Sequence, residues 1–235
     1  MLQACLNGAR MPGEHPRLPV TPAALAADAA AAQAAGAAAL HVHVKSAAGT
    51  DTFAARPLAA TLEAIRRAAP GLPVGVTTGA WAQPDVEARL ANISTWSALP
   101  DHASVNWHED GAEQVAAALL ERGIGVEAGL WTPTALDSWL RSGLRGRCLR
   151  VLLELPDRDA EVTERLSGHL LGRLREARDV VPVLLHGEGE STWPALRLAR
   201  RLGLDTRIGL EDTLRLPDGA LAPDNAALVA AAAEV

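Results

Sequence analysis

The sequence lacks the features of several protein classes. Cys5 and Cys148 are the only cysteines in 235 residues, too few for a disulfide framework, so we expect a protein of a reducing compartment. The mildly apolar stretch 23–40 is interrupted by Asp28 and Gln33, and no run of about 18 strongly apolar residues predicts a membrane span. The N-terminus has no basic region followed by an apolar core, which argues against a signal peptide. We therefore expect a soluble cytoplasmic protein.

Basic residues are outnumbered by acidic ones, and lysine is almost absent. The net charge is −6 and the isoelectric point about 5.6, so the composition gives no support for a nucleic-acid partner. Lys45 is the only lysine among the 22 basic residues, and tyrosine is missing. A mechanism that needs a lysine Schiff base therefore has one candidate. Hydrophobic residues make up 49% of the chain, which excludes a mainly disordered protein and supports one large core.

Strand-like and helix-like segments alternate about eight times, at a spacing of roughly 30 residues that is typical of (β/α)8 barrels. The predicted strands cover residues 3–7, 37–44, 73–77, 103–107, 125–130, 147–155, 181–186 and 206–210. The predicted helices cover residues 22–36, 57–69, 84–92, 111–122, 133–142, 159–178, 191–202 and 223–234. No linker composition or charge block divides the chain. We predict an α/β fold, a (β/α)8 TIM barrel that forms one domain over residues 1–235.

A His-x-His pair ends the second predicted strand. Side chains alternate along a strand, so His41, His43 and Lys45 share one face. Two imidazoles at this spacing can bind one metal ion together, and the site then needs a further imidazole or anionic ligand. Glu211, after the last predicted strand, is the best distant candidate. The alternative is a pair of histidines that are hydrogen-bonded inside the core.

Polar residues gather where the predicted strands end, which is where (β/α)8 barrels place their active sites. They are Asn7, Arg10, His41, His43, Thr77, Thr78, Asn106, Glu127, Glu154, His186, Glu211 and Asp212. Glu211 and Asp212 are neighbours and diverge in extended backbone, which suits one metal ligand and one base or substrate-binding group. An N-cap role is the alternative for Asp212. Arg207 can hold a substrate carboxylate or orient Asp212, and Thr77-Thr78-Gly79 offers hydroxyls and backbone N–H groups to an anion.

Four motifs extend over nearly the whole chain. They are Asn7-Gly8-Ala9-Arg10 with Pro12-Gly13-Glu14-His15-Pro16, His41-Val42-His43, Thr77-Thr78-Gly79, and Gly209-Leu210-Glu211-Asp212. In this order and spacing they resemble the β-keto acid cleavage enzymes of the 3-keto-5-aminohexanoate cleavage type. That family consists of zinc-dependent (β/α)8 barrels, which convert a β-keto acid and acetyl-CoA into acetoacetate and a new acyl-CoA.

The resemblance implies a role for each of these motifs. His41, His43 and Glu211 would hold the zinc ion, which polarises the keto oxygen of the substrate. Asp212, assisted by Arg207, would be the base that starts the carbon–carbon bond chemistry. We expect the side chains around the substrate to include Glu14, Thr77, Thr78, Glu127 and Asn7.

The chain departs from the family pattern in two places. His-x-His is followed by Val44-Lys45-Ser46 instead of the usual Pro-Arg-Asp. After strand four the family carries an extended loop that helps to build the thioester site, whereas here the link 106–111 is short. We therefore expect weaker binding of coenzyme A than in the longer relatives. The short link would expose Trp81, Trp107 and Trp131 unless another copy covers them, so we predict a homo-oligomer, a dimer or tetramer.

Three other functions fit parts of the sequence. Lys45 follows strand two on the histidine face and could serve a lysine-dependent aldolase. A zinc hydrolase of the amidohydrolase type also uses His-x-His, with His186 as the candidate for a later histidine ligand. A shortened barrel that binds zinc or a small acid without turnover is the non-enzyme alternative. Borohydride trapping separates the lysine route from the metal routes, and retained metal without turnover favours the non-enzyme.

Overall fold

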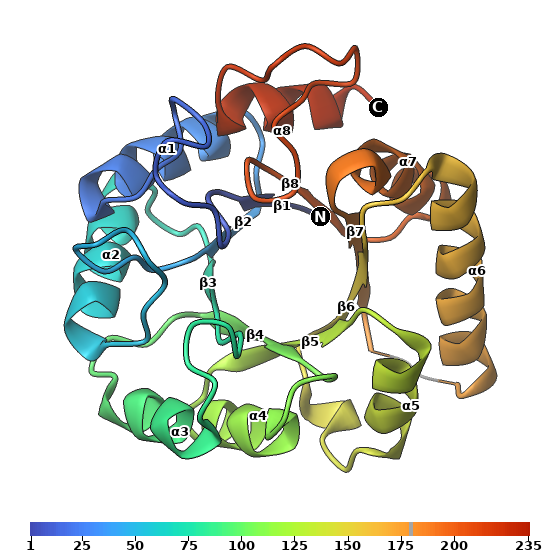
Figure 1. The fold of residues 1–235 in the computed structure, drawn as a ribbon, viewed down its shortest axis with the longest axis horizontal. Helices are drawn as coiled ribbons and strands as arrows, with labels where there is room; N and C mark the ends of the chain where they lie inside the picture. The colour runs from blue at the N-terminus through green and yellow to red at the C-terminus, as the bar shows by residue number, and fades with distance from the viewer. Residues whose placement is uncertain (179–180) are drawn as a thin grey trace.

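Strands and helices alternate around a barrel, with the strands inside and the helices outside (Figure 1). The structure, a computed structural model, describes residues 1–178 and 181–235. The strands in this part of the chain are β1 (Leu2–Cys5), β2 (Ala39–Val42), β3 (Val74–Thr77), β4 (His102–Asn106), β5 (Gly125–Leu130), β6 (Arg150–Leu155), β7 (Val183–Gly187) and β8 (Thr206–Ile208). The α-helices are α1 (Pro22–Ala34), α2 (Ala55–Ala68), α3 (Val86–Thr95), α4 (Ala112–Glu121), α5 (Pro133–Arg141), α6 (Ala160–Glu176), α7 (Thr192–Leu202) and α8 (Asn225–Ala233). Two short 3-10 helices are η1 (Arg145–Arg147) and η2 (Gly189–Ser191).

All eight strands form one parallel sheet in the order β7-β6-β5-β4-β3-β2-β1-β8. An isolated parallel bridge between Leu184 and Asp205 joins the two outer strands, and the Leu185 N–H donates to the Asp205 carbonyl at 2.9 Å. The sheet therefore closes on itself. The predicted (β/α)8 barrel is confirmed, and the loops that follow the strands meet at one mouth.

Local sequence explains where the helices begin. The Thr21 hydroxyl accepts a hydrogen bond from the Ala24 N–H at 3.1 Å, and Pro22 occupies the first turn of α1. Asp159 and Asp224 cap α6 and α8 in the same way, each through its carboxylate. Such caps satisfy N–H groups that have no partner within the helix. The helices are thereby set at fixed points after each strand.

The two faces of the sheet differ in chemistry. Outward-facing residues such as Leu40, Val42 and Val76 pack against the helices in the apolar core. Side chains that alternate with them are buried inside the barrel and include many polar groups, among them Gln3, His41, His43, His102, Glu127 and Arg207. A polar barrel interior costs free energy unless its groups find partners. The polar groups inside the barrel are therefore candidates for a functional site.

The observed element bounds differ from the predicted ones in two places that matter for the site. The strand predicted over 37–44 ends at Val42, because the Asn7 side chain replaces the next strand partner: its Oδ1 accepts from the His43 N–H and its Nδ2 donates to the His43 carbonyl. The strand predicted over 206–210 ends at Ile208, where the chain turns at Gly209. Within the described residues, no helix is long and apolar enough to cross a bilayer.

Candidate active site and metal centre

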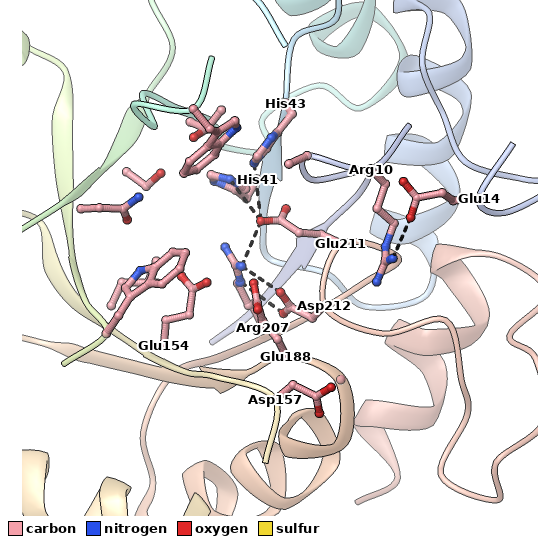
Figure 2. A pocket seen from close by; sticks show the side chains of 18 residues that line it. Arg10, Glu14, His41, His43, Glu154, Asp157, Glu188, Arg207, Glu211 and Asp212 are labelled. Atoms are coloured by element: carbon pink, nitrogen blue, oxygen red, sulfur yellow. Dashed lines mark hydrogen bonds and ion pairs between the residues drawn. The ribbon is translucent and has the colours of Figure 1, made fainter. Parts of the chain in front are cut away.

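A cavity of about 460 Å³ opens at the mouth formed by the carboxyl ends of the strands. Its wall includes side chains from the β1–α1, β3–α3, β5–α5 and β7–α7 connections, as well as strand residues such as Ser104, Asn106 and Leu152. Figure 2 shows His41, His43, Arg207, Glu211 and Asp212 clustered on one side of this cavity, with Glu188 beside Arg207 and Glu154 further along the wall.

Three potential metal ligands converge at this cavity. His41 Nε2 lies 3.7 Å and His43 Nε2 3.5 Å from Glu211 Oε1. One ligand atom from each of the three residues lies within 4.8 Å of the other two. Both imidazoles are almost completely buried, and the Glu211 side chain is 12% exposed. The structure thus brings together the three ligands predicted from the sequence, in an arrangement that leaves the cavity side open.

The protonation chemistry of these groups fits a metal ion. Burial lowers the pKa of His41 to about 4, so its imidazole is neutral and carries a lone pair. Against burial, the carboxylates of Glu211 and Asp51 raise the pKa of His43 to about 9, and a metal ion at Nε2 would displace that proton. Burial opposes ionisation of Glu211, but Arg207 and the two histidines hold its pKa well below the usual range. Glu211 Oε2 is buried without a hydrogen-bond partner. Two imidazoles, one carboxylate and an open position suit zinc.

Asp212 and Arg207 form a charged pair beside the three ligands. Arg207 donates from Nη2 to Asp212 Oδ1 at 2.8 Å and from Nε to Asp212 Oδ2 at 3.2 Å. Arg207 Nη2 also donates to Glu211 Oε1 at 3.0 Å. Burial opposes ionisation of Asp212, but the charge of Arg207 lowers its pKa. Asp212 is therefore an ionised carboxylate on the cavity wall, able to accept a proton.

The turn after β8 explains how two neighbouring carboxylates reach one cavity. We expect them to diverge from an extended backbone, but the N–H groups of Asp212 and Thr213 both donate to the Gly209 carbonyl, which makes this segment a helical turn. The correction matters because both side chains now line the cavity. Gly8 completes the arrangement. Its φ is +56°, and a Cβ there would lie 2.5 Å from Glu211 Cγ, so glycine is needed at this close approach.

Two of the five residues expected around the substrate line the cavity. The Glu14 carboxylate lies in the β1–α1 loop, pairs with Arg10 at 3.2 Å and accepts from the Met11 N–H, which lowers the pKa of Glu14. Thr77 lies at the end of β3, and its hydroxyl accepts from the Gly79 N–H at 3.1 Å. Both are within reach of a ligand in the cavity.

The other three lie outside the cavity wall. Asn7 is fully buried and bonds backbone groups of Pro19 and His43. The Thr78 hydroxyl donates to the Ser104 carbonyl at 2.7 Å, and the Thr78 N–H uses the same oxygen, so neither is free for the expected anion. Glu127 lies deeper in the barrel, where it accepts from Gln3 at 3.0 Å. In this structure each of the three contacts protein groups, and its role toward the substrate stays a prediction.

Sequence reasoning missed four residues of the site. Asp51 Oδ2 accepts from His43 Nδ1 at 2.9 Å, and the Trp81 indole stacks on the His43 ring with centroids 5.7 Å apart. The Cys5 thiol, whose pKa is raised by burial and by Asp212, donates to Asp212 Oδ2 at 3.2 Å. Glu188 lies on the cavity wall. The one available signal was Asp51, the single acidic residue in the Ser/Ala/Gly/Thr loop after β2.

Three acidic residues, Glu154, Asp157 and Glu188, form an acidic rim of the cavity at the ends of β6 and β7. Burial, together with the charges of Glu154 and Asp212, raises the pKa of Glu188 to about 8. His186, the candidate ligand of the zinc-hydrolase alternative, lies behind this rim. Arg207 Nε lies 3.1 Å from its Nδ1, and its Nε2 faces Glu154 Oε2 at 3.5 Å. Against burial and the charge of Arg207, Asp212 and Glu154 raise the pKa of His186 to about 9. His186 therefore links the Asp212 pair to the rim and does not approach the three ligands.

Lys45 and the tryptophans bear on two further expectations. Lys45 Nζ donates to the Gly8 and Arg10 carbonyls and to Asp51 Oδ1, and three donated bonds leave no lone pair for a Schiff base. Lys45 is the only lysine, so the lysine-dependent aldolase has no candidate nucleophile.

Trp107 is only 5% exposed, whereas Trp81 is 47% exposed. The exposed aromatic surface is therefore smaller than expected, and the homo-oligomer stays a prediction.

The link after β4 is as short as expected, since β4 ends at Asn106 and α4 begins at Ala112. Its residue Glu109 accepts from the Ala80 N–H at 2.9 Å and from Arg89 Nη1 at 3.0 Å. These bonds tie the link to the β3–α3 connection, through Ala80, and to α3, through Arg89. The short segment is a fixed part of the barrel wall.

Comparisons with known proteins agree with this geometry. No curated protein matches the sequence. Three solved structures of ObcA match it: the apo structure (17% identity, TM-score 0.73), a ternary complex with a C4-CoA adduct and oxalate (17%, 0.74) and a binary complex with oxaloacetate (18%, 0.72). Each match covers 93% of this chain and 61%, 63% and 63% of the ObcA chains, so this chain spans less than two thirds of their length. At these identities the likeness shows the fold.

The sequence profile of one family, the beta-keto acid cleavage enzymes, matches residues 1–235. The match extends over the opening motif, both histidines and the Glu211–Asp212 pair. The chain belongs to the beta-keto acid cleavage enzyme family.

Proposed function

We propose that this chain is a zinc-dependent enzyme that converts a β-keto acid and acetyl-CoA into acetoacetate and a new acyl-CoA. One observation carries the proposal: His41, His43 and Glu211 present ligand atoms within 4.8 Å of one another, beside the ionised Asp212–Arg207 pair in the same cavity. Zinc held by these three ligands would act as a Lewis acid toward the keto oxygen of the substrate.

The residues of the chain account for the proton steps. Asp212 takes a proton from the carbon between the keto group and the carboxylate of the substrate. That carbon adds to the thioester carbonyl of acetyl-CoA, and the thiolate leaves. The thiolate then adds to the original keto carbon of the substrate. The bond between that keto carbon and the carbon that was deprotonated breaks, which releases the new acyl-CoA, and Asp212 returns the proton to the same carbon to give acetoacetate. Arg207 stays fully charged throughout and compensates the changing charge of Asp212.

The solved ObcA complexes support the choice of ligands. One contains oxaloacetate, a small keto acid, and another contains a C4-CoA adduct with oxalate. We propose the same two chemical classes for this cavity, with Glu14 and Thr77 beside the small acid. Because the link after β4 is short, we expect weaker coenzyme A binding than in longer relatives. A homo-oligomer and a cytoplasmic location remain predictions.

The decisive experiment follows carbon atoms. The zinc-loaded protein is mixed with acetyl-CoA that carries ¹³C in both acetyl carbons, together with members of a β-keto acid panel. Acetoacetate labelled at its keto and methyl carbons is the expected product, because these carbons come from the acetyl group. Acetate and a free carboxylic acid formed from the β-keto acid without acetyl-CoA, and with no labelled acetoacetate, would indicate hydrolysis. Retained zinc without turnover on any member of the panel would make the chain a binding barrel.

A further inference from the structure

Asp51 is shared by donors from three parts of the chain. Its Oδ2 accepts from His43 Nδ1 at 2.9 Å and from Trp81 Nε1 at 2.8 Å, and its Oδ1 accepts from Lys45 Nζ at 2.6 Å. The Asp51 side chain is only 5% exposed. A buried carboxylate with three such donors has little freedom to rotate. The Asp51 carboxylate therefore holds the side chains of His43, Trp81 and Lys45 in fixed orientations.

Trp81 touches His43 twice, once directly and once through Asp51. The indole ring lies nearly parallel to the imidazole, with an interplanar angle of 17°. On another side the ring rests on Gly79, where an added Cβ would come within 2.1 Å of it. The indole thus covers one face of His43, although almost half of Trp81 is exposed.

Lys45 connects Asp51 to the other side of the metal centre. Besides Asp51, it donates to the Gly8 and Arg10 carbonyls of the β1–α1 loop, at 2.7 and 3.0 Å. Gly8 in turn packs closely against Glu211. The same ammonium therefore holds the segment that supports the third ligand.

We propose that Trp81 and Lys45 are positioning residues of the metal centre, and that both act through Asp51. Together they keep the His43 Nδ1–H on Asp51 and turn its Nε2 toward Glu211. This inference rests on the proposed metal site, since it concerns how that site presents one ligand. Outer partners of this kind set the orientation and basicity of a metal-bound histidine.

The test measures zinc affinity and not turnover. Zinc is titrated into the full-length, metal-free protein in competition with a chromophoric chelator, and tryptophan emission is recorded in parallel. Trp81→Phe keeps an aromatic ring over His43 and removes the N–H donor. Asp51→Asn removes the charge that all three donors share. Trp193→Phe is the matched control, because Trp193 on α7 also donates from Nε1, to the Arg215 carbonyl at 3.0 Å, and does not line the cavity.

We expect Asp51→Asn to weaken zinc binding by about 10- to 100-fold and Trp81→Phe by roughly 3- to 10-fold, in line with other outer partners of metal ligands. The control should stay within about twofold of the wild type, as expected for a residue outside such a shell. Zinc should change the emission of the wild type and of Trp193→Phe, and this change should be lost in Trp81→Phe.

Two results would overturn the inference while leaving the proposed function intact. Wild-type zinc affinity in Trp81→Phe would remove Trp81 from this role, and wild-type affinity in a folded Asp51→Asn protein would remove the whole arrangement. Trp81→Phe is the safer variant for folding, since its ring is half exposed. A wild-type protein that binds no zinc would overturn both proposals together.

Discussion

The two ends of the barrel interior each bury a network of charges, yet they differ in one decisive respect. At the amino ends of the strands, Glu127 Oε1 accepts from Gln3 at 3.0 Å and lies 3.1 Å from Arg150 Nε, and Arg150 continues to Asp205. At the carboxyl ends, Glu211 and Asp212 share Arg207. Burial does not separate the two ends, because Glu127 and Asp212 are both almost inaccessible.

Unpartnered atoms do not separate them either. Glu127 Oε2 and Gln3 Oε1 lack hydrogen-bond partners, as does Glu211 Oε2. The difference is that three potential metal ligands converge on an open cavity only at the carboxyl ends, among the described residues. At the amino ends, the histidine of the network, His102, packs on Gly75 and lies 3.7 Å from the single carboxylate Glu127. Convergence on accessible space marks the functional end, whereas buried charge alone does not.

The largest expected effect comes from removing one histidine at each end. His43→Ala should reduce zinc affinity by about 100-fold or more, since losing a ligand exceeds the loss of an outer partner. His102→Ala should retain one zinc per chain. Metal analysis of both purified proteins after dialysis makes this comparison. Zinc lost from the His102 variant, or kept in the His43 variant, would place the metal elsewhere.

The next effect separates chemistry from metal binding at the carboxyl ends. Asp212→Asn should keep zinc and lose about 10²- to 10⁴-fold in turnover, because an amide cannot accept the proton. Glu211→Gln is the comparison variant, which should lose zinc first. The measurement is turnover with the labelled acetyl-CoA alongside metal content. Zinc lost together with activity in Asp212→Asn would make Asp212 a ligand and exchange the roles of the two carboxylates.

How far the site could be predicted depends on which of its contacts are local. The barrel follows from alternating segments, and the approach of His41, His43 and Glu211 follows from placing these residues at strand ends. Strand alternation also shows that Glu127 points inward. It does not give depth along the barrel axis, and Glu127 lies level with Arg150, below the cavity. The sequence therefore predicts the inward direction of the Glu127 side chain but not its distance from the mouth of the barrel.

The missed contacts depend on loop conformation. Asp51 reaches His43 because the Ser46 N–H donates to the Thr50 carbonyl at 2.7 Å and turns the chain back. Trp81 reaches Asp51 from a different connection. The periodicity of the strands and helices does not predict loop conformations that bring Asp51 and Trp81 back to His43. The turn at Gly209, which aims both carboxylates at the cavity, is another case, because a one-residue change in where a strand ends reverses the side-chain direction.

A smaller effect tests the amino-terminal network as a source of stability. Glu127→Gln removes the carboxylate that lies between Arg150 and His102, and breaking a buried ion pair costs about 3 kcal/mol. The remaining Asp205 contact of Arg150 limits this cost. Chemical denaturation should show the loss, while zinc affinity and turnover of the folded protein stay at wild-type levels. Lost turnover at unchanged stability would instead return Glu127 to the substrate site.

The smallest effect is a pH dependence that has opposite signs at the two ends. Burial and the charges of Glu154 and Asp212 raise the pKa of Glu188 to about 8, so the folded protein keeps a proton that the unfolded chain releases near its ordinary value of 4.5. The stabilisation from this proton is complete below that ordinary pKa and is lost as pH rises toward 8. For Glu127, His102 and Arg150 outweigh burial and lower the pKa, so its contribution is present above the ordinary pKa and is lost as pH falls.

Glu188→Gln should therefore flatten the decline in unfolding free energy between pH 4.5 and pH 8, the window between the ordinary and the raised pKa of Glu188. The expected difference from the wild type is on the order of 2 kcal/mol, because each unit of pKa difference is worth about 1.4 kcal/mol and solvent at the partly exposed rim screens part of the effect. Glu190→Gln, two residues along and exposed, is the matched control and should keep the wild-type slope. Denaturation of the three proteins at several pH values provides the measurement. A Glu188→Gln protein with the wild-type slope would mean that the rim carboxylates are ionised together, as they would be if a cation occupied the cavity beside them.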